Sequence, residues 1–157
     1  NVLLETLDGE PLLRARQEMC AIDVRDHSLR RVDSTPFPMD MDLLRPVVTA
    51  PCRRMKLKLG EECLVYSYQV RTMDTDLNHH MNNTNYIRLI LDAQPSSFWD
   101  RYRVQEFDVH YVNESVEGEE IQVYCQTEAQ EMAVQIKRGE TTLVKAFLQL
   151  AQREKSE

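Results

Sequence analysis

The sequence predicts an α+β fold in which a curved, largely antiparallel sheet wraps one long buried helix. Two runs of alternating apolar residues precede a segment that is apolar on nearly all sides, and four more alternating runs follow it. Alternation with a period of two is typical of strands, whereas an all-round apolar segment is typical of a buried helix. A single hydrophobic helix is buried only if the sheet curves around it, and this order of elements indicates the α+β class.

Length and composition limit the classes of protein to consider. The chain has 157 residues, of which 42% are hydrophobic and 29% are charged, as expected for a globular chain with one core. The net charge of −7 argues against nucleic acid as a partner, because phosphate binding needs a basic surface. No apolar run reaches the roughly 18 residues of a membrane span, and no secretory signal opens the chain. The four separated cysteines predict reduced thiols in a compartment of the cytoplasmic type.

The N-terminal third predicts a hairpin followed by a linker. Residues 1–23 form two apolar runs around the turn signal Asp8-Gly9, and a polar, turn-like stretch completes residues 1–33. Residues 34–55 contain four of the six prolines, a density that neither a helix nor a central strand tolerates. We therefore expect a boundary between domains within residues 34–55.

After the linker the period of the apolar residues changes twice. Residues 53–59 (RRMKLKL) and 63–72 (CLVYSYQVRT) alternate as strands, and residues 85–93 (NYIRLILDA) predict the buried helix, which Pro95 ends. Residues 96–102 predict a short second helix capped by Ser96 or Ser97. The remaining strands are expected at the end of the chain, over residues 104–112 and 119–128 and, around a turn at Arg138-Gly139, over residues 132–150.

The stretch DTDLNHHMNNTNY, residues 74–86, has three Asn, two Asp and two His in its first ten positions. It fails as an EF-hand, because position 6 is His79 instead of Gly and position 12 is Asn85 instead of Glu. A zinc site from Asp76, His80 and His110 lacks any diagnostic spacing. We therefore predict no metal.

Two interpretations of this stretch remain open. Asn82 or Asn83 can simply cap the helix that follows, which is common for Asn before a helix. Alternatively, Asp76, Asn78 and His80 alternate, and in an extended loop they would point the same way beside the helix N-terminus. That end carries unpaired N–H groups and suits an oxyanion during attack on a carbonyl.

Three segments of the sequence also resemble a known protein family. The run RTMDTDLNHHMNNTNYI resembles the signature D-x-N-x-H-[VM]-N-N-x-x-Y-[IL] of the acyl-acyl carrier protein thioesterases of bacteria and plant plastids. EFDVHYVNES resembles that family's second signature, Y-x-x-E-[CS]. EMCAIDVRDHSLRRVDSTPF is similar to the segment that ends the family's first domain, so the resemblance covers most of residues 11–130.

The resemblance implies a hot-dog fold and a chain of two such domains with catalysis in the second. Residues 1–33 would be the terminal hairpin of a preceding hot-dog domain, residues 34–55 the linker, and residues 56–157 the catalytic domain. The chain is then either one piece of a longer polypeptide or a short member, and we expect a second hot-dog domain upstream or in a homo-oligomer. No cofactor is implied. The localisation would be cytoplasmic, or plastid for a plant protein.

Family roles carry over to Asp76, Asn78, His80 and Glu114, which match the signatures residue for residue. Glu114 would activate water or attack the thioester, His80 and Asn78 would orient the carbonyl or the water, and Asp76 would fix the loop. The helix N-terminus at Asn82 and Asn83 would hold the oxyanion. Ser115 stands where many plant members have cysteine, which removes the thiol from any mechanism.

The expected function is hydrolysis of fatty acyl thioesters on acyl carrier protein. A basic run at Arg53, Arg54, Lys56 and Lys58 is either a solvated strand face or a docking site for that acidic carrier. Two alternatives remain, namely an acyl-coenzyme A thioesterase and a hot-dog module that binds acyl chains or mediates assembly without turnover.

Overall fold

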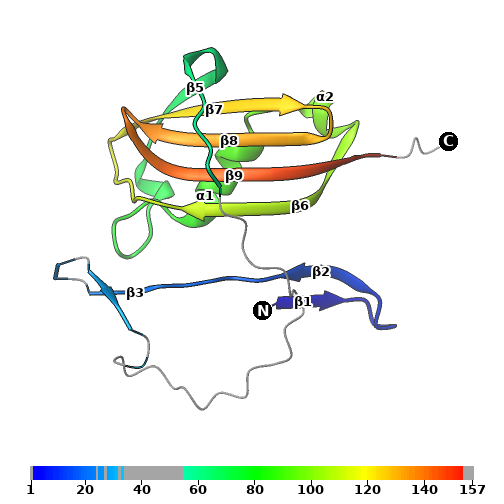
Figure 1. The fold of residues 1–157 in the computed structure, drawn as a ribbon, viewed down its shortest axis with the longest axis horizontal. Helices are drawn as coiled ribbons and strands as arrows, with labels where there is room; N and C mark the ends of the chain where they lie inside the picture. Colours follow the sequence, from blue (N-terminus) through cyan, green and yellow to red (C-terminus); the bar gives the residue numbers. More distant parts are fainter. Residues whose placement is uncertain (1, 24, 27, 32, 34–54, 154–157) are drawn as a thin grey trace. The chain divides into compact units, whose positions relative to one another are not determined.

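The computed structural model describes residues 2–23, 25–26, 28–31, 33 and 55–153, and Figure 1 shows the fold. The chain divides into two compact units, Asn1–Arg53 and Arg54–Glu157. All but the last residue of the predicted linker, 34–55, lies outside the described residues.

The first unit begins with the predicted hairpin. Strands β1 (Val2–Glu5) and β2 (Pro11–Ala15) pair antiparallel, with Leu4 opposite Leu13. Gly9 has a φ of 84°, the left-handed conformation that glycine adopts without strain, so the turn lies where the sequence predicts it.

The second strand of this hairpin is shorter than predicted. It ends at Ala15 instead of continuing toward residue 23, and Ala21–Ile22 (β3) pairs with Leu29–Arg30 (β4) in a separate two-stranded ladder. Arg30 also donates to the Asp23 carboxylate at 2.9 Å, which closes this second hairpin. The apolar pattern runs through both ladders because each has alternating side chains, so periodicity alone did not reveal the break.

The described part of the second unit contains an antiparallel sheet of five strands in the order β5-β7-β8-β9-β6, one strand fewer than the sequence predicts. Its strands are β5 (Leu64–Gln69), β6 (Tyr102–Tyr111), β7 (Glu120–Glu128), β8 (Glu131–Arg138) and β9 (Thr141–Gln152). Short 3-10 helices, η2 (Glu61–Cys63) and η3 (Thr72–Asp74), flank β5. The α+β class is therefore confirmed.

The central helix is short, so the prediction of a long helix was wrong. Helix α1 (Asn83–Leu91) has nine residues, and α2 (Ser96–Trp99) follows after a turn. The N-cap of α2 is Pro95, without a side-chain cap, instead of Ser96 or Ser97. Nine residues give only about 14 Å of helix, so α1 covers only part of the sheet. Phe98 of α2 adds to the same buried core.

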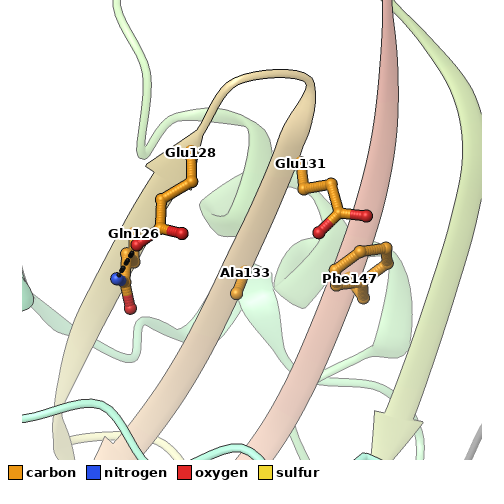
Figure 2. A pocket seen from close by; sticks show the side chains of 5 residues that line it. All are labelled: Gln126, Glu128, Glu131, Ala133 and Phe147. Atoms are coloured by element: carbon orange, nitrogen blue, oxygen red, sulfur yellow. Dashed lines mark hydrogen bonds between the residues drawn. The ribbon is translucent and has the colours of Figure 1, made fainter.

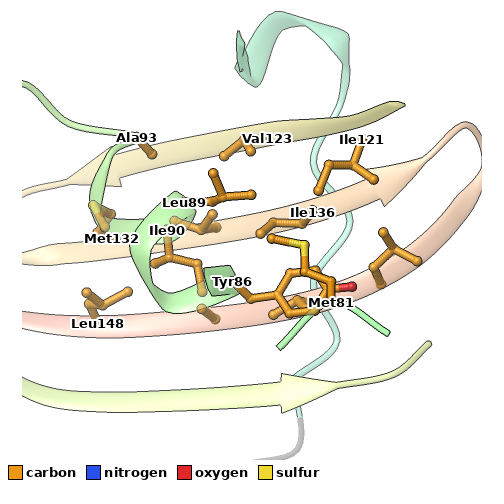
Figure 3. Close-up of a cluster of buried hydrophobic side chains, with 14 of the residues drawn as sticks. Met81, Tyr86, Leu89, Ile90, Ala93, Ile121, Val123, Met132, Ile136 and Leu148 are labelled. Atoms are coloured by element: carbon orange, nitrogen blue, oxygen red, sulfur yellow. The ribbon is translucent and has the colours of Figure 1, made fainter. Parts of the chain in front are cut away.

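The core lies between α1 and the inner face of the sheet. Figure 3 shows Leu89 and Ile90 of α1 among side chains of β7, β8 and β9. The strand residues alternate as predicted, since Val134 and Ile136 are fully buried whereas Ala133 and Lys137 are half-buried on the other face. The sheet residues of this buried apolar cluster are Ile121, Val123, Met132, Val134, Ile136, Leu143, Val144, Ala146, Leu148 and Leu150.

Residues 55–59, predicted to form a strand, do not pair with any described strand edge. They cross the outer face of the sheet, where the Leu59 N–H donates to Gln135 Oε1 at 2.8 Å and Lys137 Nζ donates to the Leu59 carbonyl at 2.8 Å (Figure 1). Lys56 and Lys58 are exposed, whereas Leu59 is buried. The alternation is therefore real, but it reflects contact with the face of a sheet instead of membership in one.

No described helix is long and apolar enough to cross a membrane.

Candidate active site

Two loops of the second unit carry the predicted site residues. Residues 75–81 join η3 to α1, and residues 112–119 join β6 to β7. The loops are far apart in sequence, so only the fold brings them together. An isolated bridge pairs His80 with Val116, which places one residue of each loop side by side. The Met81 N–H also donates to the Ser115 carbonyl at 2.8 Å.

His80 and Glu114 form the centre of the site. The His80 Nε2 atom lies 3.3 Å from Glu114 Oε2. The side chains remain 38% and 61% exposed, so both can contact a substrate. The structure thus brings together the two residues that match the two separate signatures. A carboxylate beside an imidazole can take a proton from water or act as a nucleophile, with the imidazole as its hydrogen-bond partner.

Asp76 and Asn78 lie at the exposed tip of the first loop. The loop is a tight turn there, because the His79 N–H donates to the Asp76 carbonyl at 3.0 Å and His79 has a φ of 63°. The Asn78 N–H donates to Asp76 Oδ1 at 2.8 Å, an Asx turn. The expectation of an extended loop at these residues was therefore wrong. The Asp76 carboxylate stabilises the turn through its contact with the Asn78 N–H.

Asn82 and Asn83 begin helix α1. The Asn82 side chain accepts from the Thr84 N–H at 2.8 Å, and the Asn82 carbonyl accepts from the Asn85 N–H at 2.9 Å. Asn82 is thus the N-cap, one of the two roles left open by the sequence. The first N–H of the helix, that of Asn83, takes part in neither of these two bonds.

Asp74 holds the base of the first loop, although nothing in the sequence pattern selects it over Asp76. Asp74 is 3% exposed, and its carboxylate accepts from the Tyr68 hydroxyl at 2.7 Å and from Arg88 at 3.0 Å. The hydrogen bond that Arg88 donates to the Tyr68 hydroxyl raises the pKa of Arg88. Burial distinguishes Asp74 from Asp76, and the sequence of residues 74–86 alone does not reveal which of them is buried.

The second loop is held at its far end by Glu119. Arg138 donates to both oxygens of this carboxylate, at 2.7 and 2.6 Å, and the Val116 N–H donates at 3.0 Å. Burial alone would raise the pKa of Glu119, but the hydrogen bonds from Arg138 and Val116 outweigh it and lower the pKa. Arg138 also reaches the Glu114 carbonyl at 3.4 Å, so this cluster fixes the backbone that carries Glu114.

Ser115 points away from the exposed pair and into the core. It is 1% exposed, and its hydroxyl lies 2.6 Å from the Tyr86 hydroxyl of α1. Burial raises the pKa of Tyr86. Glu114, the residue before Ser115, is exposed. The position that carries cysteine in many plant members thus holds a core contact here.

The described residues contain no group of three His, Cys, Asp or Glu side chains that could hold a metal ion. A shallow pocket lies elsewhere, at the β7–β8 turn, and is lined by Gln126, Glu128, Glu131, Ala133 and Phe147 (Figure 2). Gln126 Nε2 donates to Glu128 Oε1 at 2.7 Å inside it. Ala133 belongs to the outer face of β8, so this pocket opens on the side of the sheet opposite the core.

Comparison with models of protein families gives a match that lies within the second unit. Residues 57–146, more than half of the chain, match the model described as the acyl-ACP thioesterase C-terminal domain. No curated protein matches the chain at a significant level.

Solved structures show the same fold at low sequence identity. An acyl-ACP thioesterase from Bacteroides thetaiotaomicron is 23% identical with a TM-score of 0.67, over 83% of this chain and 53% of that one. A putative oleoyl thioesterase from Lactobacillus plantarum is 19% identical with a TM-score of 0.58, over 71% and 46%. A 12:0-ACP thioesterase from Umbellularia californica is 18% identical with a TM-score of 0.58, over 64% and 40%. The matched region is about half the length of these structures or less.

Proposed function

The chain belongs to the acyl-ACP thioesterase family, and from that premise we propose that it hydrolyses the thioester of a fatty acyl chain carried on acyl carrier protein. The reaction would release the free fatty acid and end chain elongation. The observation that carries the proposal is the 3.3 Å contact between His80 Nε2 and Glu114 Oε2, which joins the two signature segments at an accessible position.

In the proposed mechanism Glu114 takes a proton from a water molecule, whose oxygen attacks the thioester carbonyl carbon. The carbonyl oxygen becomes negative, and the Asn83 N–H at the start of α1 stabilises it. When the oxyanion collapses, the carbon–sulfur bond breaks, and the thiolate of the carrier takes up the proton that Glu114 had accepted. His80 orients the Glu114 carboxylate throughout, through the contact at its Nε2 atom.

Asp76 and Asn78 act together at the loop tip in this proposal. Asp76 stabilises the turn through the Asn78 N–H, and the Asn78 amide side chain is exposed in the same loop that carries His80. An exposed amide both donates and accepts, so it can orient the substrate carbonyl or the attacking water.

The test is hydrolysis by variants at Glu114, followed through release of the free carrier thiol. Glu114→Gln is nearly isosteric but cannot accept a proton, so turnover should fall by about a hundredfold or more. Glu117→Gln is the matched control, because this exposed glutamate lies in the same loop and contacts Thr72 instead of His80. Turnover close to wild type in Glu114→Gln would rule out the carboxylate mechanism.

The carrier is tested with two thioesters of the same acyl chain, one on acyl carrier protein and one on coenzyme A. We expect the higher kcat/KM for the acyl carrier protein. A preference for coenzyme A would identify an acyl-CoA thioesterase instead. Binding of acyl chains with no hydrolysis of either thioester would identify a module for acyl binding or assembly.

We also propose that a second hot-dog domain completes the substrate site. Residues 1–33 would be the end of a preceding domain, residues 34–55 a linker, and residues 56–157 the catalytic domain. Three observations support this division: the boundary between compact units at Arg53, the family match that starts at residue 57, and the exposed apolar residues of β1 and β2. Those exposed residues are Val2, Leu3, Leu4, Leu12 and Leu13.

Light scattering after size-exclusion chromatography tests the second domain. The exposed apolar side chains and outer edges of the β1–β2 hairpin invite pairing with another chain, so the 157-residue chain should self-associate. A monomer that is well folded and active at micromolar concentration would show that one hot-dog unit suffices.

A further inference from the structure

We propose that Asp74 is a positioning residue of the site, because it fastens the base of the loop 75–81 and thereby holds the His80 imidazole against Glu114. The kinetic consequence rests on the proposed function. The geometric consequence does not, since the contact between His80 and Glu114 is observable without any substrate.

The first step of the argument is the burial of Asp74. Among the described residues it is the only charged one that is buried, with 3% of its surface exposed. Burying a carboxylate is costly unless donors replace the lost water, and three donors do so here. The Arg71 N–H and the Tyr68 hydroxyl donate to Oδ2 at 2.8 and 2.7 Å, and Arg88 donates to Oδ1 at 3.0 Å. The carboxylate therefore ties strand β5 to helix α1.

The second step is the main-chain carbonyl of the same residue. It accepts from the Asn82 N–H at 2.8 Å and from Asn85 Nδ2 at 3.0 Å. Asp74 immediately precedes the loop and Asn82 immediately follows it, so this pair closes the neck of the loop. A bridge between Thr75 and Met81 continues the closure one residue further in.

The third step leads from the neck to the reactive pair. The Asp76 N–H donates to the His80 carbonyl at 2.9 Å, so the backbone of His80 is held by the same closed loop. The pairing of His80 with Val116 then sets this backbone against the loop that carries Glu114. The side chain of Asp74 thus determines where His80 lies, although nothing in the structure places it in contact with either reactive side chain.

Charge is part of this role, because only a carboxylate satisfies all three donors. In Asp74→Asn one oxygen becomes an amide NH2 group, which turns a donor toward Tyr68 and Arg71 or toward Arg88. The neck should then loosen, and a displacement of His80 by about 1 Å is enough to lower turnover by up to about a hundredfold.

The experiment compares Asp74→Asn and Arg88→Met with the control Gln135→Met. Arg88 is 49% exposed, so its replacement should leave the protein folded while removing one donor. Gln135 is buried on the outer face of the sheet, where it accepts from the Leu59 N–H and donates to Thr142 Oγ1, and neither of these partners belongs to the neck. The control therefore removes a buried polar group without touching the neck.

Two readouts separate positioning from stability. In the folded fraction of Asp74→Asn, kcat should fall by about tenfold or more while KM changes by less than about threefold, and Arg88→Met should show a smaller loss of the same kind. The imidazole NMR resonances of His80 should shift in both variants toward those of Glu114→Gln, with those of His110 on β6 unchanged. Gln135→Met should lower the melting temperature and leave kcat and the His80 resonances as in wild type.

The proposal is overturned if folded Asp74→Asn keeps wild-type kcat and wild-type His80 resonances. If Asp74→Asn does not fold, wild-type values in Arg88→Met overturn it in the same way. If the wild-type protein hydrolyses no thioester, the proposed function fails, and the His80 resonances alone then support or overturn the role of Asp74.

Discussion

The two loops and the residue that precedes the first of them carry polar residues at two levels, one buried and one exposed, and the two levels behave differently. At the buried level, Asp74 is 3% exposed and has three donors on its carboxylate, and Ser115 is 1% exposed and contacts Tyr86. At the exposed level, His80 and Glu114 are 38% and 61% exposed and are paired with each other. The buried level is satisfied within the protein, whereas the exposed level retains hydrogen-bonding capacity for a ligand.

This difference explains why neighbouring polar residues of one run have different roles. A buried carboxylate needs all its hydrogen bonds inside the protein, so it fixes geometry. An exposed carboxylate keeps water around it and is free to exchange that water for substrate. The prediction for each residue therefore follows from its level: substitution of the exposed pair should reduce turnover with little loss of stability. Substitution of a buried residue should reduce stability, and at Asp74 it should also reduce turnover through the position of His80.

The largest remaining effect is expected at His80. His80→Gln should lower turnover by roughly a hundredfold, because Glu114 loses the partner that orients it, while the free energy of unfolding changes little. Steady-state kinetics and urea unfolding on the same sample measure both. His79→Asn is the control, since His79 is exposed at a φ of 63° and asparagine tolerates that conformation. Equal losses of turnover in His80→Gln and His79→Asn would indicate that turnover depends on the conformation of the loop and not on the contact between His80 and Glu114.

Glu119 should contribute stability that depends on pH. The pKa of Glu119 is lowered below its ordinary value of 4.5, so its contribution is present above pH 4.5 and is lost as the pH falls through the lowered pKa. At neutral pH, Glu119→Gln should destabilise the protein by about 1 to 3 kcal/mol, the usual size for hydrogen bonds to a charged group.

Urea unfolding of wild type and Glu119→Gln at several pH values measures this contribution. The difference between the two proteins should shrink below pH 4.5. A difference that stays constant down to pH 3 would contradict the assignment of the lowered pKa to the contacts of Glu119 with Arg138 and Val116.

The smallest effect is expected at Ser115. Ser115→Ala leaves the buried Tyr86 hydroxyl without this partner and should cost about 1 to 2 kcal/mol of stability, with turnover within a few-fold of wild type. A double-mutant cycle with Tyr86→Phe isolates the contact, measured by thermal unfolding. A loss of turnover as large as in Glu114→Gln would instead point to a hydroxyl nucleophile and would break the division into two levels.

The sequence by itself determined the class of fold, the number of strands after the helix and the identity of the exposed pair. Periods of two and near 3.6 are local properties of the backbone, so alternation revealed β6 to β9 and the position of α1. The signatures selected His80 and Glu114 because those residues stand at fixed distances from recognisable neighbours. Local chemistry also identified Asn82 as a candidate cap.

Only the tertiary structure decided what each pattern contacts. The alternation of residues 55–59 is the same for a strand and for a segment lying across a sheet, and the contacts with Gln135 and Lys137 distinguish them. Asp74 and Asp76 are chemically identical in the sequence, but the first is buried among donors from β5 and α1 and the second caps an exposed turn. Burial is a property of the assembled chain, because it depends on residues far away in sequence, and it is burial that separates the residues that hold this site from those available to act in it.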